Sequence, residues 1–461
     1  MKKIQPLGLL FKEIGKNYYY DTITNRIVAI DDKTFLDIDK CLKGEGKMTK
    51  NIEYMISKGM ISTTTISNIY HPMTDYLECL LNNYVSSITL QVTQNCNMRC
   101  RYCSYSGDGL LDRTRNGTVM TWEIAKESID FLFTHSKYAK NITIAFYGGE
   151  PLLNYDLIRR IVDYSNKLFV GRHIDYGMTT NGTVMNDEIL RLIEENNFNL
   201  LLSLDGSKDC HDKNRRMLFD GSGSYRLIER NLLFIKDKAP SFYKKIIFNS
   251  VVELDHTIDN CVDFFSDCPM TKDNRVVINE VYDKRINVTY PVTEEYTNSK
   301  DVFLLNNLLN EYAWKNEPNV EVGEIKEIKK TIKVLSSQVY TKSVSHPAGV
   351  CIPGLNKAIV DCTGKIRICE RVSEKNESFI IGDVINGFYI NKIKKLLNIG
   401  NLTAEKCEQC WAFNLCDQCV ARISDNGELN SINKSKECHS TQKKAFRNLK
   451  AYIAIKEAYK L

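Results

Sequence analysis

The stretch that decides the fold is Ser87-Ile-Thr-Leu-Gln-Val-Thr93, followed at once by Gln94-Asn-Cys96-Asn-Met-Arg-Cys100-Arg-Tyr-Cys103. The first seven residues are rich in β-branched and apolar side chains, which predicts a buried strand. The three cysteines follow a CxxxCxxC spacing on one loop. Soft thiolates are the ligands of iron–sulfur clusters, and three of them on a cubane cluster leave one iron open for a substrate or cofactor. A zinc site is the alternative, although it needs a fourth ligand.

Runs of the same strand-like kind recur downstream of this stretch. They cover residues 142–147, 174–180, 200–206, 246–252 and 275–281. Amphipathic helical patterns separate them, and strands that alternate with helices predict a parallel sheet. Six units are too few for an eight-stranded barrel. The predicted fold class is therefore α/β, a partial (β/α)6 TIM barrel, in which chemistry is expected at the C-terminal ends of the strands.

Three short motifs follow the second, third and fourth of these strands. They are Tyr147-Gly-Gly-Glu150-Pro151, Thr180-Asn-Gly-Thr183 and Ser203-Leu-Asp205-Gly206. Each motif alone is only a turn signal. Taken in order with CxxxCxYC, they resemble the radical S-adenosylmethionine (SAM) superfamily over residues 87–285.

The resemblance implies a 4Fe–4S cluster on Cys96, Cys100 and Cys103, with SAM chelated at the open iron. Reductive cleavage of SAM would give a 5′-deoxyadenosyl radical that abstracts hydrogen from a C–H bond. The implied SAM contacts are Tyr102, Gly148, Gly149, Glu150, Thr180, Asn181, Ser203 and Asp205. For Tyr102, stacking on adenine and simple packing are equal alternatives. No catalytic residue beyond the clusters is identified.

A few other polar residues are weaker candidates. Asn249, and Arg215 or Arg216, are candidates to contact SAM or a peptide, against a polar strand end and a solvated charge pair. His211 and His346 are expected to be structural.

Composition excludes several classes of protein. The chain has 461 residues, 16 cysteines and a net charge of +5. This slight charge gives no electrostatic case for nucleic acid, and no apolar run is long enough for a transmembrane helix. The N-terminus lacks the features of a signal peptide, so a cytoplasmic location is expected. In a reducing cytosol, clustered cysteines indicate metal binding rather than disulfides.

The C-terminal cysteines form two further groups. Cys351, Gly364 and Cys369 match C-x12-G-x4-C, and Cys407-x2-Cys410-x5-Cys416-x2-Cys419 is followed by Cys438. This pattern resembles the SPASM domain, which holds two auxiliary 4Fe–4S clusters, so the chain is expected to carry three clusters in all. The spacing of two between Cys416 and Cys419 departs from the usual pattern. A zinc ribbon is the alternative for the CxxC pairs.

The resemblance also implies a pairing of these cysteines. Auxiliary cluster I takes Cys351, Cys369 and Cys419. Auxiliary cluster II takes Cys407, Cys410, Cys416 and Cys438. Cluster I then has three protein ligands. Its fourth is either Cys362, which lies in a predicted hairpin over 359–368, or an open iron that binds the thiolate of a substrate cysteine; we favour the open iron.

The first 70 residues predict a small separate domain. Two alternating runs within 18–30 flank a Thr-Asn turn and predict a β-hairpin. Helices are predicted through Phe35 to Leu42 after Asp31 and Asp32, and from Ile52 to Lys58 before Gly59. This winged-helix pattern resembles the leader-recognition element of ribosomal-peptide maturases, whose edge strand accepts a peptide. A DNA-binding winged helix is the alternative.

The predicted organisation has four parts: a recognition element (1–70), a radical SAM partial barrel (71–285), a helical bridging region (286–345) and a SPASM domain (346–461), which a helix over about 441–459 closes. This order resembles peptide maturases that install thioether crosslinks. We expect a Cys-rich precursor peptide as substrate, a flavodoxin or ferredoxin as external reductant, and anaerobic conditions. The alternatives are carbon–carbon crosslinking, epimerisation or sulfatase activation and, from another class, a non-catalytic iron–sulfur or zinc regulatory protein.

Overall fold

The structure is a computed structural model that describes residues 6–103, 117–281, 290–315, 318–337, 340–423 and 429–459. The predicted boundary at 285/286 lies outside these residues. The chain divides into two compact units. The first, here called the barrel unit, comprises Tyr76–Gly323 and Pro353–Ile393. The second, the composite unit, comprises Met1–Asp75, Glu324–Ile352 and Lys394–Leu461.

The barrel unit contains the predicted parallel strands. They are β5 (Ser87–Thr93), β6 (Asn141–Gly148), β7 (His173–Thr180), β8 (Asn199–Ser203), β9 (Ile247–Val252) and β10 (Val276–Glu280). Each strand pairs in parallel with the next one along the chain. The predicted α/β fold is confirmed, and the C-terminal ends of these strands share one edge.

The sheet extends beyond these strands on both sides and comprises eleven strands within the described part of the chain. At one end β11 (Val320–Val322) pairs with β10, within a region for which the sequence predicted only helices. At the other end β13 (Ile359–Val360) pairs in parallel with β5. The antiparallel strands β14 (Lys365–Arg367), β15 (Ile380–Asp383) and β16 (Gly387–Phe388) follow. The predicted 359–368 hairpin is confirmed, and Gly364 supplies its turn with φ +86°.

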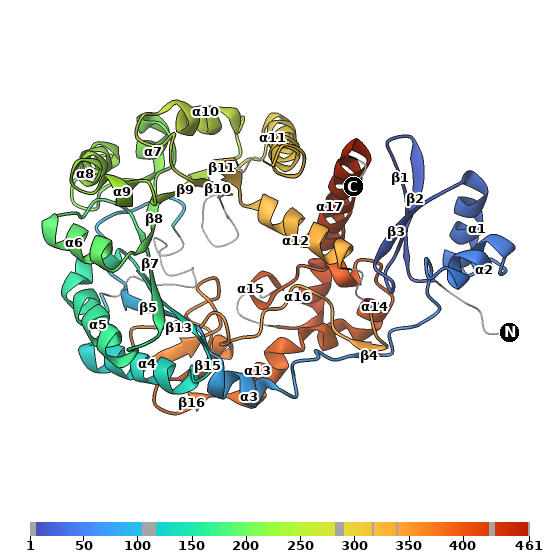
Figure 1. Ribbon diagram of the computed structural model, residues 1–461, viewed down its shortest axis with the longest axis horizontal. Helices are drawn as coiled ribbons and strands as arrows, with labels where there is room; N and C mark the ends of the chain where they lie inside the picture. The colour runs from blue at the N-terminus through green and yellow to red at the C-terminus, as the bar shows by residue number, and fades with distance from the viewer. Residues whose placement is uncertain are drawn as a thin grey trace. The chain divides into compact units, whose positions relative to one another are not determined.

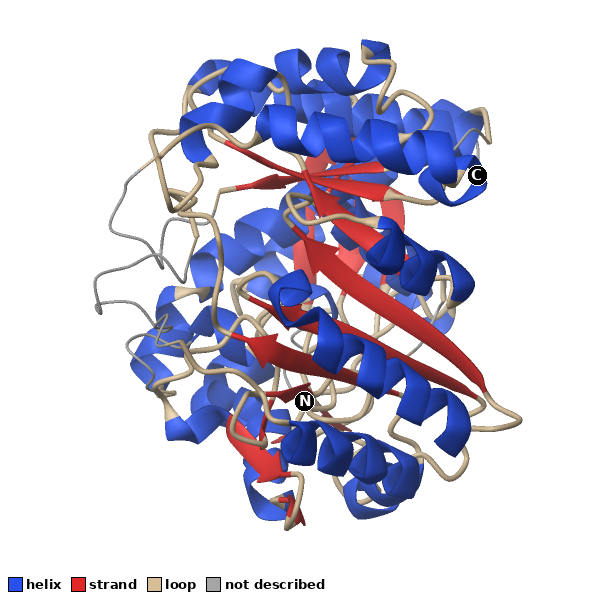
Figure 2. Ribbon diagram, turned by 90° about the vertical axis from the view of Figure 1, so that its left-hand side faces the viewer, coloured by secondary structure: helices blue, strands red, loops and turns tan. Residues whose placement is uncertain are grey.

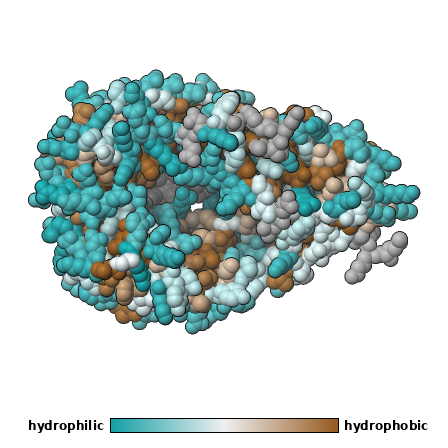
Figure 3. Space-filling view, viewed as in Figure 1, coloured by the Kyte–Doolittle hydropathy of each residue, from teal (hydrophilic) through white to brown (hydrophobic). Residues whose placement is uncertain are grey.

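Helices cover the outer face of this sheet (Figures 1 and 2). They are α3 (Leu77–Asn83), α4 (Trp122–His135), α5 (Tyr155–Leu168), α6 (Asp187–Glu195), α7 (Lys208–Asn214), α8 (Tyr225–Lys238), α9 (Pro240–Tyr243), α10 (Asp259–Asp267) and α11 (Glu294–Ala313). Helix α6 is typical: Asn186 caps its first turn, and Ile189, Leu190 and Ile193 are buried. Its other face is polar, and Figure 3 shows that the outer margin of this unit is mainly hydrophilic.

The composite unit begins with the segment for which the sequence predicts a small separate domain, and it joins that segment with later parts of the chain. Strands β1 (Gly8–Glu13), β2 (Lys16–Asp21) and β3 (Arg26–Ile30) form an antiparallel sheet in which β2 is central. The predicted 18–30 hairpin is confirmed, with Asn25 at φ +54° in its turn. Both predicted helices are present, α1 (Asp32–Leu42), capped by Asp31, and α2 (Lys50–Ser57). Strand β1 was not predicted.

The two faces of this small sheet are both covered. Tyr19 packs with Ile38 and Ile52 of α1 and α2 on one face. Tyr18 and Tyr20, which alternate with Tyr19, pack on the other face with residues of α12 (Glu324–Ser336) and α17 (Cys438–Tyr459). Helix α17 contains the predicted C-terminal helix. A pleated strand sends successive side chains to opposite faces, so one short run of tyrosines joins two cores.

The rest of the composite unit consists of short elements. Strand β4 (Asn68–Ile69) pairs with β12 (Val344–Ser345). The remaining helices include α14 (Ala404–Glu408), α15 (Val420–Ile423) and α16 (Ser431–Lys436), while α13 (Ile390–Leu397) spans the boundary between the units. None of the described helices combines the length and the apolar character that a membrane crossing requires.

Candidate functional site

The loop with Cys96, Cys100 and Cys103 leaves the C-terminal end of β5, and the GGEP segment packs directly on it. Gly149 N donates to Thr93 O at 2.9 Å, and Glu150 N donates to Asn95 O at 2.8 Å. A Cβ on Gly148 would come within 2.0 Å of Thr93 O, and one on Gly149 within 2.0 Å of Asn95 O. Only glycine allows this approach, so the two glycines fix the position of the cysteine loop.

Glu150 is buried beneath this loop and binds the third motif. Its carboxylate accepts from Thr180 Oγ1 at 2.8 Å, from Asn181 N at 2.7 Å and from Leu152 N at 3.2 Å. Burial raises the pKa of Glu150, and these donors act against that rise. A carboxylate has roughly four acceptor sites, so some capacity remains for the amino group of a ligand.

Asn181 joins the third motif to the cysteine loop. Its Nδ2 donates to Asn97 Oδ1 at 2.9 Å and points at Cys96 Sγ at 3.9 Å. Asn97 Nδ2 in turn donates to Thr183 Oγ1 at 2.8 Å. The backbone N–H of Met98 also points at Cys96 Sγ, at 3.4 Å. N–H groups directed at the sulfur suit a thiolate ligand, and thus an iron–sulfur cluster.

A buried ion pair connects the same loop to the fourth motif. The Tyr102 hydroxyl donates to Asp205 and accepts from Arg215 NH1, the latter at 2.8 Å. Arg215 NH1 lies 3.8 Å from Asp205 Oδ1, and both side chains are almost fully buried. Burial raises the pKa of Asp205, and Arg215 opposes that rise. The same burial raises the pKa of the Cys100 thiol to about 12, with Arg215 again opposing.

His211 connects the backbones of the two residues in this ion pair. Its Nδ1 accepts from Asp205 N at 3.2 Å, and its Nε2 lies 2.9 Å from Ser224 Oγ, which bonds to Arg215 O. Burial lowers the pKa of His211 to about 2, so the ring is neutral. The interpretation of His211 as structural agrees with these contacts.

The structure therefore brings all four motifs together at one edge of the sheet. Ser203 is the last residue of β8, and its hydroxyl has no hydrogen-bond partner among the described residues. Both carboxylate oxygens of Asp205, in contrast, contact protein groups. Arg215 is buried, so it is not a solvated charge, while Arg216 is exposed. Asn249 Oδ1 accepts from Asn279 at 2.8 Å. Sequence patterns did not indicate a role for Asn97, because amides in loops are common. Thr183 ends the third motif but was not among the expected SAM contacts.

The composite unit gathers a second set of thiols, and each receives an N–H donor. Lys434 Nζ donates to Cys407 Sγ at 3.3 Å, Gln442 Nε2 to Cys410 Sγ at 3.5 Å and Gln418 Nε2 to Cys438 Sγ at 3.6 Å. The backbone N–H of Gln418 donates to Cys416 Sγ. These are the four cysteines that the SPASM resemblance assigns to auxiliary cluster II.

The same four thiols are also close enough to interact electrostatically. Burial raises the pKa of Cys416 to about 12, and Cys410 and Cys407 add to the rise. Burial likewise raises the pKa of Cys410, with Cys407 and Cys438 contributing. Four sulfurs that each face an N–H donor fit an iron–sulfur cluster, which would hold them as thiolates.

The cysteines expected at auxiliary cluster I are divided between the units. Cys351 and Cys419 belong to the composite unit and Cys369 to the barrel unit. Gly349, at φ +96°, approaches the backbone so closely that a Cβ would meet Cys416 O at 2.5 Å. This approach brings the chain leading to Cys351 beside the segment that carries Cys416 and Cys419.

Cys362 lies closer to backbone carbonyl oxygens than the cysteines of the second set, among which Cys438 Sγ also donates, to Lys434 O at 3.6 Å. It is buried in the barrel unit, where its Sγ lies 3.0 Å from Gln91 O and 3.7 Å from Thr118 O. Burial raises the pKa of this thiol to about 12. The 3.0 Å contact with Gln91 O suits a neutral thiol at Cys362.

Among the described residues, no group of three His, Cys, Asp or Glu side chains converges as ligands of a single metal ion.

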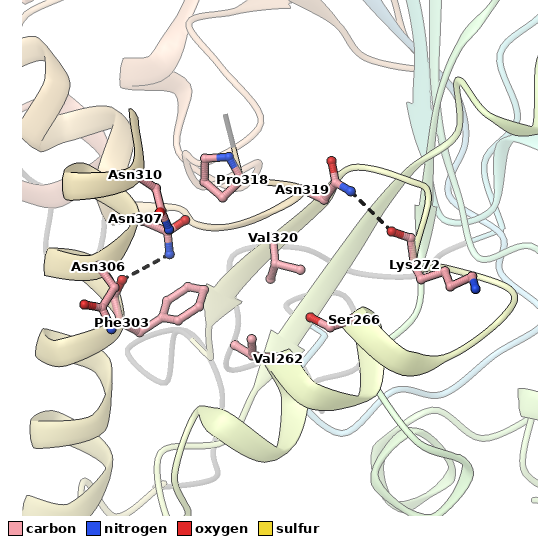
Figure 4. A pocket seen from close by; sticks show the side chains of 10 residues that line it. All are labelled: Val262, Ser266, Lys272, Phe303, Asn306, Asn307, Asn310, Pro318, Asn319 and Val320. Carbon is pink, nitrogen blue, oxygen red and sulfur yellow. Dashed lines mark hydrogen bonds between the residues drawn. The ribbon is translucent and has the colours of Figure 1, made fainter. Parts of the chain in front are cut away.

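A cavity of about 430 Å³ between α10, α11 and β11 is separate from the four motifs (Figure 4). Phe303, Asn307 and Asn310 face Val320 across it. Val320 begins β11, so this cavity lies toward the N-terminal ends of the strands, away from the edge that carries the four motifs.

Comparisons with known proteins agree with this geometry. A family profile described as the Radical SAM superfamily matches residues 90–247. The chain is 38% identical over 119 residues to an uncharacterized protein of Methanocaldococcus jannaschii, a match that covers 26% of this chain and 38% of that protein. It is 24% identical over 396 residues to a cysteine-type anaerobic sulfatase-maturating enzyme of Clostridium novyi, covering 82% of this chain and 99% of the relative.

A solved structure shares the fold. The structure titled "Native anSMEcpe with bound AdoMet" superposes with a TM-score of 0.59 at 18% identity, covering 81% of this chain and 99% of that one.

Proposed function

We propose that this radical SAM enzyme, a homologue of anaerobic sulfatase-maturating enzymes, is a peptide maturase that installs thioether crosslinks. It would join the sulfur of a cysteine to a carbon of another residue in a ribosomally made, Cys-rich precursor peptide. The observation that carries the proposal is the state of Cys362. Because Cys362 Sγ lies 3.0 Å from Gln91 O, we infer that Cys351, Cys369 and Cys419 alone would be the cysteine ligands of auxiliary cluster I. The vacant position would take the substrate thiolate.

The chain's own residues would prepare the radical SAM site. When bound, the cluster and SAM would supply a 5′-deoxyadenosyl radical that removes hydrogen from a C–H bond. Cys96, Cys100 and Cys103 would hold that cluster. Gly148 and Gly149 let the backbone approach, while the remaining capacity of Glu150 and the Ser203 hydroxyl would orient the amino and carboxylate groups of SAM. The Tyr102–Asp205–Arg215 contacts fix the loop that carries the cysteines and exclude water from its base.

The substrate's leader would dock on the small N-terminal sheet. Strand β3 lies at the end of that sheet, so one side of its backbone has no strand partner among the described residues. Its side chains are only half-buried. An extended peptide would add to this edge, with main-chain bonds giving affinity and side-chain pockets giving selectivity. An acidic one-electron carrier such as flavodoxin or ferredoxin would supply the reductant.

A second candidate function is maturation of a sulfatase-type cysteine. It is favoured by the Clostridium novyi relative, a cysteine-type sulfatase-maturating enzyme that the match covers over 99% of its length. Both candidates use the same radical SAM site, but they differ in the fate of the sulfur. A thioether keeps it in the peptide, whereas sulfatase maturation replaces the thiol with an aldehyde.

Mass spectrometry of the modified peptide separates these functions. The reconstituted enzyme is incubated anaerobically with SAM, reductant and a synthetic Cys-rich peptide. We expect a loss of two hydrogens per link and one fewer alkylatable thiol. A loss of two hydrogens with every thiol retained would indicate carbon–carbon crosslinking, and a loss of sulfur would indicate sulfatase-type chemistry. Either result contradicts the thioether proposal.

A further inference from the structure

Lys434 is a buried lysine at the centre of the second set of thiols. It lies on α16 and is 2% exposed, so its ammonium group does not reach solvent. Its Nζ donates to Thr403 Oγ1 at 2.6 Å and to Cys407 Sγ at 3.3 Å. Among the described residues, no carboxylate lies within ion-pairing distance of it, although most buried cations have such a partner.

A buried ammonium without an anion costs several kcal/mol, because the lost hydration is not replaced. The groups around Lys434 that can carry negative charge are sulfurs. Lys434 contacts Cys407 Sγ directly, at 3.3 Å. The other titratable neighbour, His346, is held neutral: burial lowers its pKa to about 4, and Lys434 contributes.

The position of Lys434 is therefore explained if Cys407 and Cys416 are thiolates. Buried thiolates need a metal partner of their own, because their charge has lost its hydration. A cluster ligated by four thiolates carries net negative charge in both oxidation states, and reduction adds one more negative charge. A fixed cation beside it stabilises the reduced state more than the oxidised state.

We propose that Lys434 is the charge partner of auxiliary cluster II and raises its reduction potential, which makes this site a better electron acceptor. The inference rests on the proposed assignment of Cys407, Cys410, Cys416 and Cys438 to that cluster. Lys434 is a positioning residue in this account: it acts through the sulfurs and contacts no substrate. Gln442 and Gln418 donate to two other sulfurs but bring no charge, so Lys434 supplies the electrostatic part of the effect.

A redox titration followed by electron paramagnetic resonance tests the proposal. The full chain is reconstituted anaerobically with Cys96, Cys100 and Cys103 changed to alanine, which leaves only the auxiliary clusters to observe. Lys434→Met keeps the length and apolar stem but removes the charge. We expect it to shift one midpoint potential to a more negative value, Lys434→Arg to restore most of the shift, and Lys436→Met, on the exposed side of the same helix, to cause none.

Iron content distinguishes failure of this proposal from failure of the cluster assignment. Bound iron with midpoint potentials that are the same in wild type and Lys434→Met would overturn the role of Lys434 alone. Iron content that is unchanged by Cys407→Ala together with Cys416→Ala would overturn the assignment of these cysteines, and the inference with it.

Thermal unfolding gives a second test that does not depend on a spectroscopic signal. In the chelator-treated apoprotein, Lys434 faces neutral thiols, so Lys434→Met is expected to raise the melting temperature. In the holoprotein the same change removes a favourable contact and is expected to lower it. A merely structural lysine, held by its bond to Thr403, would predict destabilisation of both forms to the same extent, and that result would contradict the proposal.

Discussion

The two cysteine regions balance their buried charges in different ways. Beneath the Cys96–Cys103 loop, the buried cation Arg215 already has a protein anion, Asp205. Around Cys407–Cys438, the buried cation Lys434 faces sulfur and hydroxyl groups. The cation of the first region is thus compensated by the polypeptide itself, whereas the cation of the second region has no carboxylate partner among the described residues. Under the proposed function, the thiolates of a bound cluster would supply the missing negative charge in the second region.

The largest expected effect is the loss of modified peptide when a cysteine of the Cys407–Cys438 region is replaced. Cys407→Ala is expected to abolish peptide modification and to lower iron content, while SAM cleavage driven by dithionite persists. Deoxyadenosine and modified peptide are quantified in the same anaerobic reaction. Cys362→Ala is the matched control, because that buried thiol donates to carbonyls and should leave the iron content unchanged. Equal loss of iron in both variants would contradict the distinction between them.

The next effect concerns the buried ion pair beneath the Cys96–Cys103 loop. Arg215→Met leaves Asp205 buried without its cation, and breaking a buried pair costs about 3–5 kcal/mol. Denaturant unfolding of the full chain measures this loss of unfolding free energy. The adjacent Arg216 is exposed, and Arg216→Met is expected to change stability by less than about 0.5 kcal/mol. If both substitutions cost the same, Arg215 is not the compensating charge.

A smaller effect is expected at the contact between GGEP and the cysteine loop. Gly149→Ala forces a Cβ against Asn95 O, and overpacking of this kind costs about 1–3 kcal/mol. Because the loop must shift, SAM cleavage should fall as well. Gly177→Ala in β7 is the control, since its nearest atom would lie at 3.7 Å, an ordinary contact. Deoxyadenosine formation unaffected by Gly149→Ala would show that the approach is not needed.

The smallest effect is a pH dependence of stability. Because the pKa of His211 is about 2 when folded and near its ordinary value when unfolded, the unfolded chain binds one more proton below about pH 6.5. Stability should therefore fall with decreasing pH, by up to about 1.4 kcal/mol per pH unit from this group. Unfolding at pH 5 to 7 measures the slope. His211→Asn, which keeps an acceptor and a donor, should flatten the slope.

Contiguous patterns predicted most of the barrel unit. Strand runs, the cysteine spacing and the three glycine-containing motifs are local, so their order along the chain is enough to place the site at the C-terminal ends of the strands. The pairing of β13 with β5 and the three-residue strand β11 could not be foreseen, because both depend on contacts between distant segments.

The sequence also could not identify the buried cations of the two regions, Arg215 and Lys434. Arg215 next to Arg216 looks like a solvated pair, and only the fold shows that one of them is buried. Lys434 lies 27 residues from Cys407 in a segment rich in lysine, where a buried cation has no distinguishing signature. Spacing identifies metal ligands, but the groups that donate to those ligands are set by tertiary packing.

The most direct test of the central claim is anaerobic formation of 5′-deoxyadenosine. Iron-reconstituted protein is incubated with SAM and dithionite, beside a variant in which Cys96, Cys100 and Cys103 are alanine. The account predicts deoxyadenosine from the wild-type chain and none above background from the variant. Identical traces from the two proteins would contradict it.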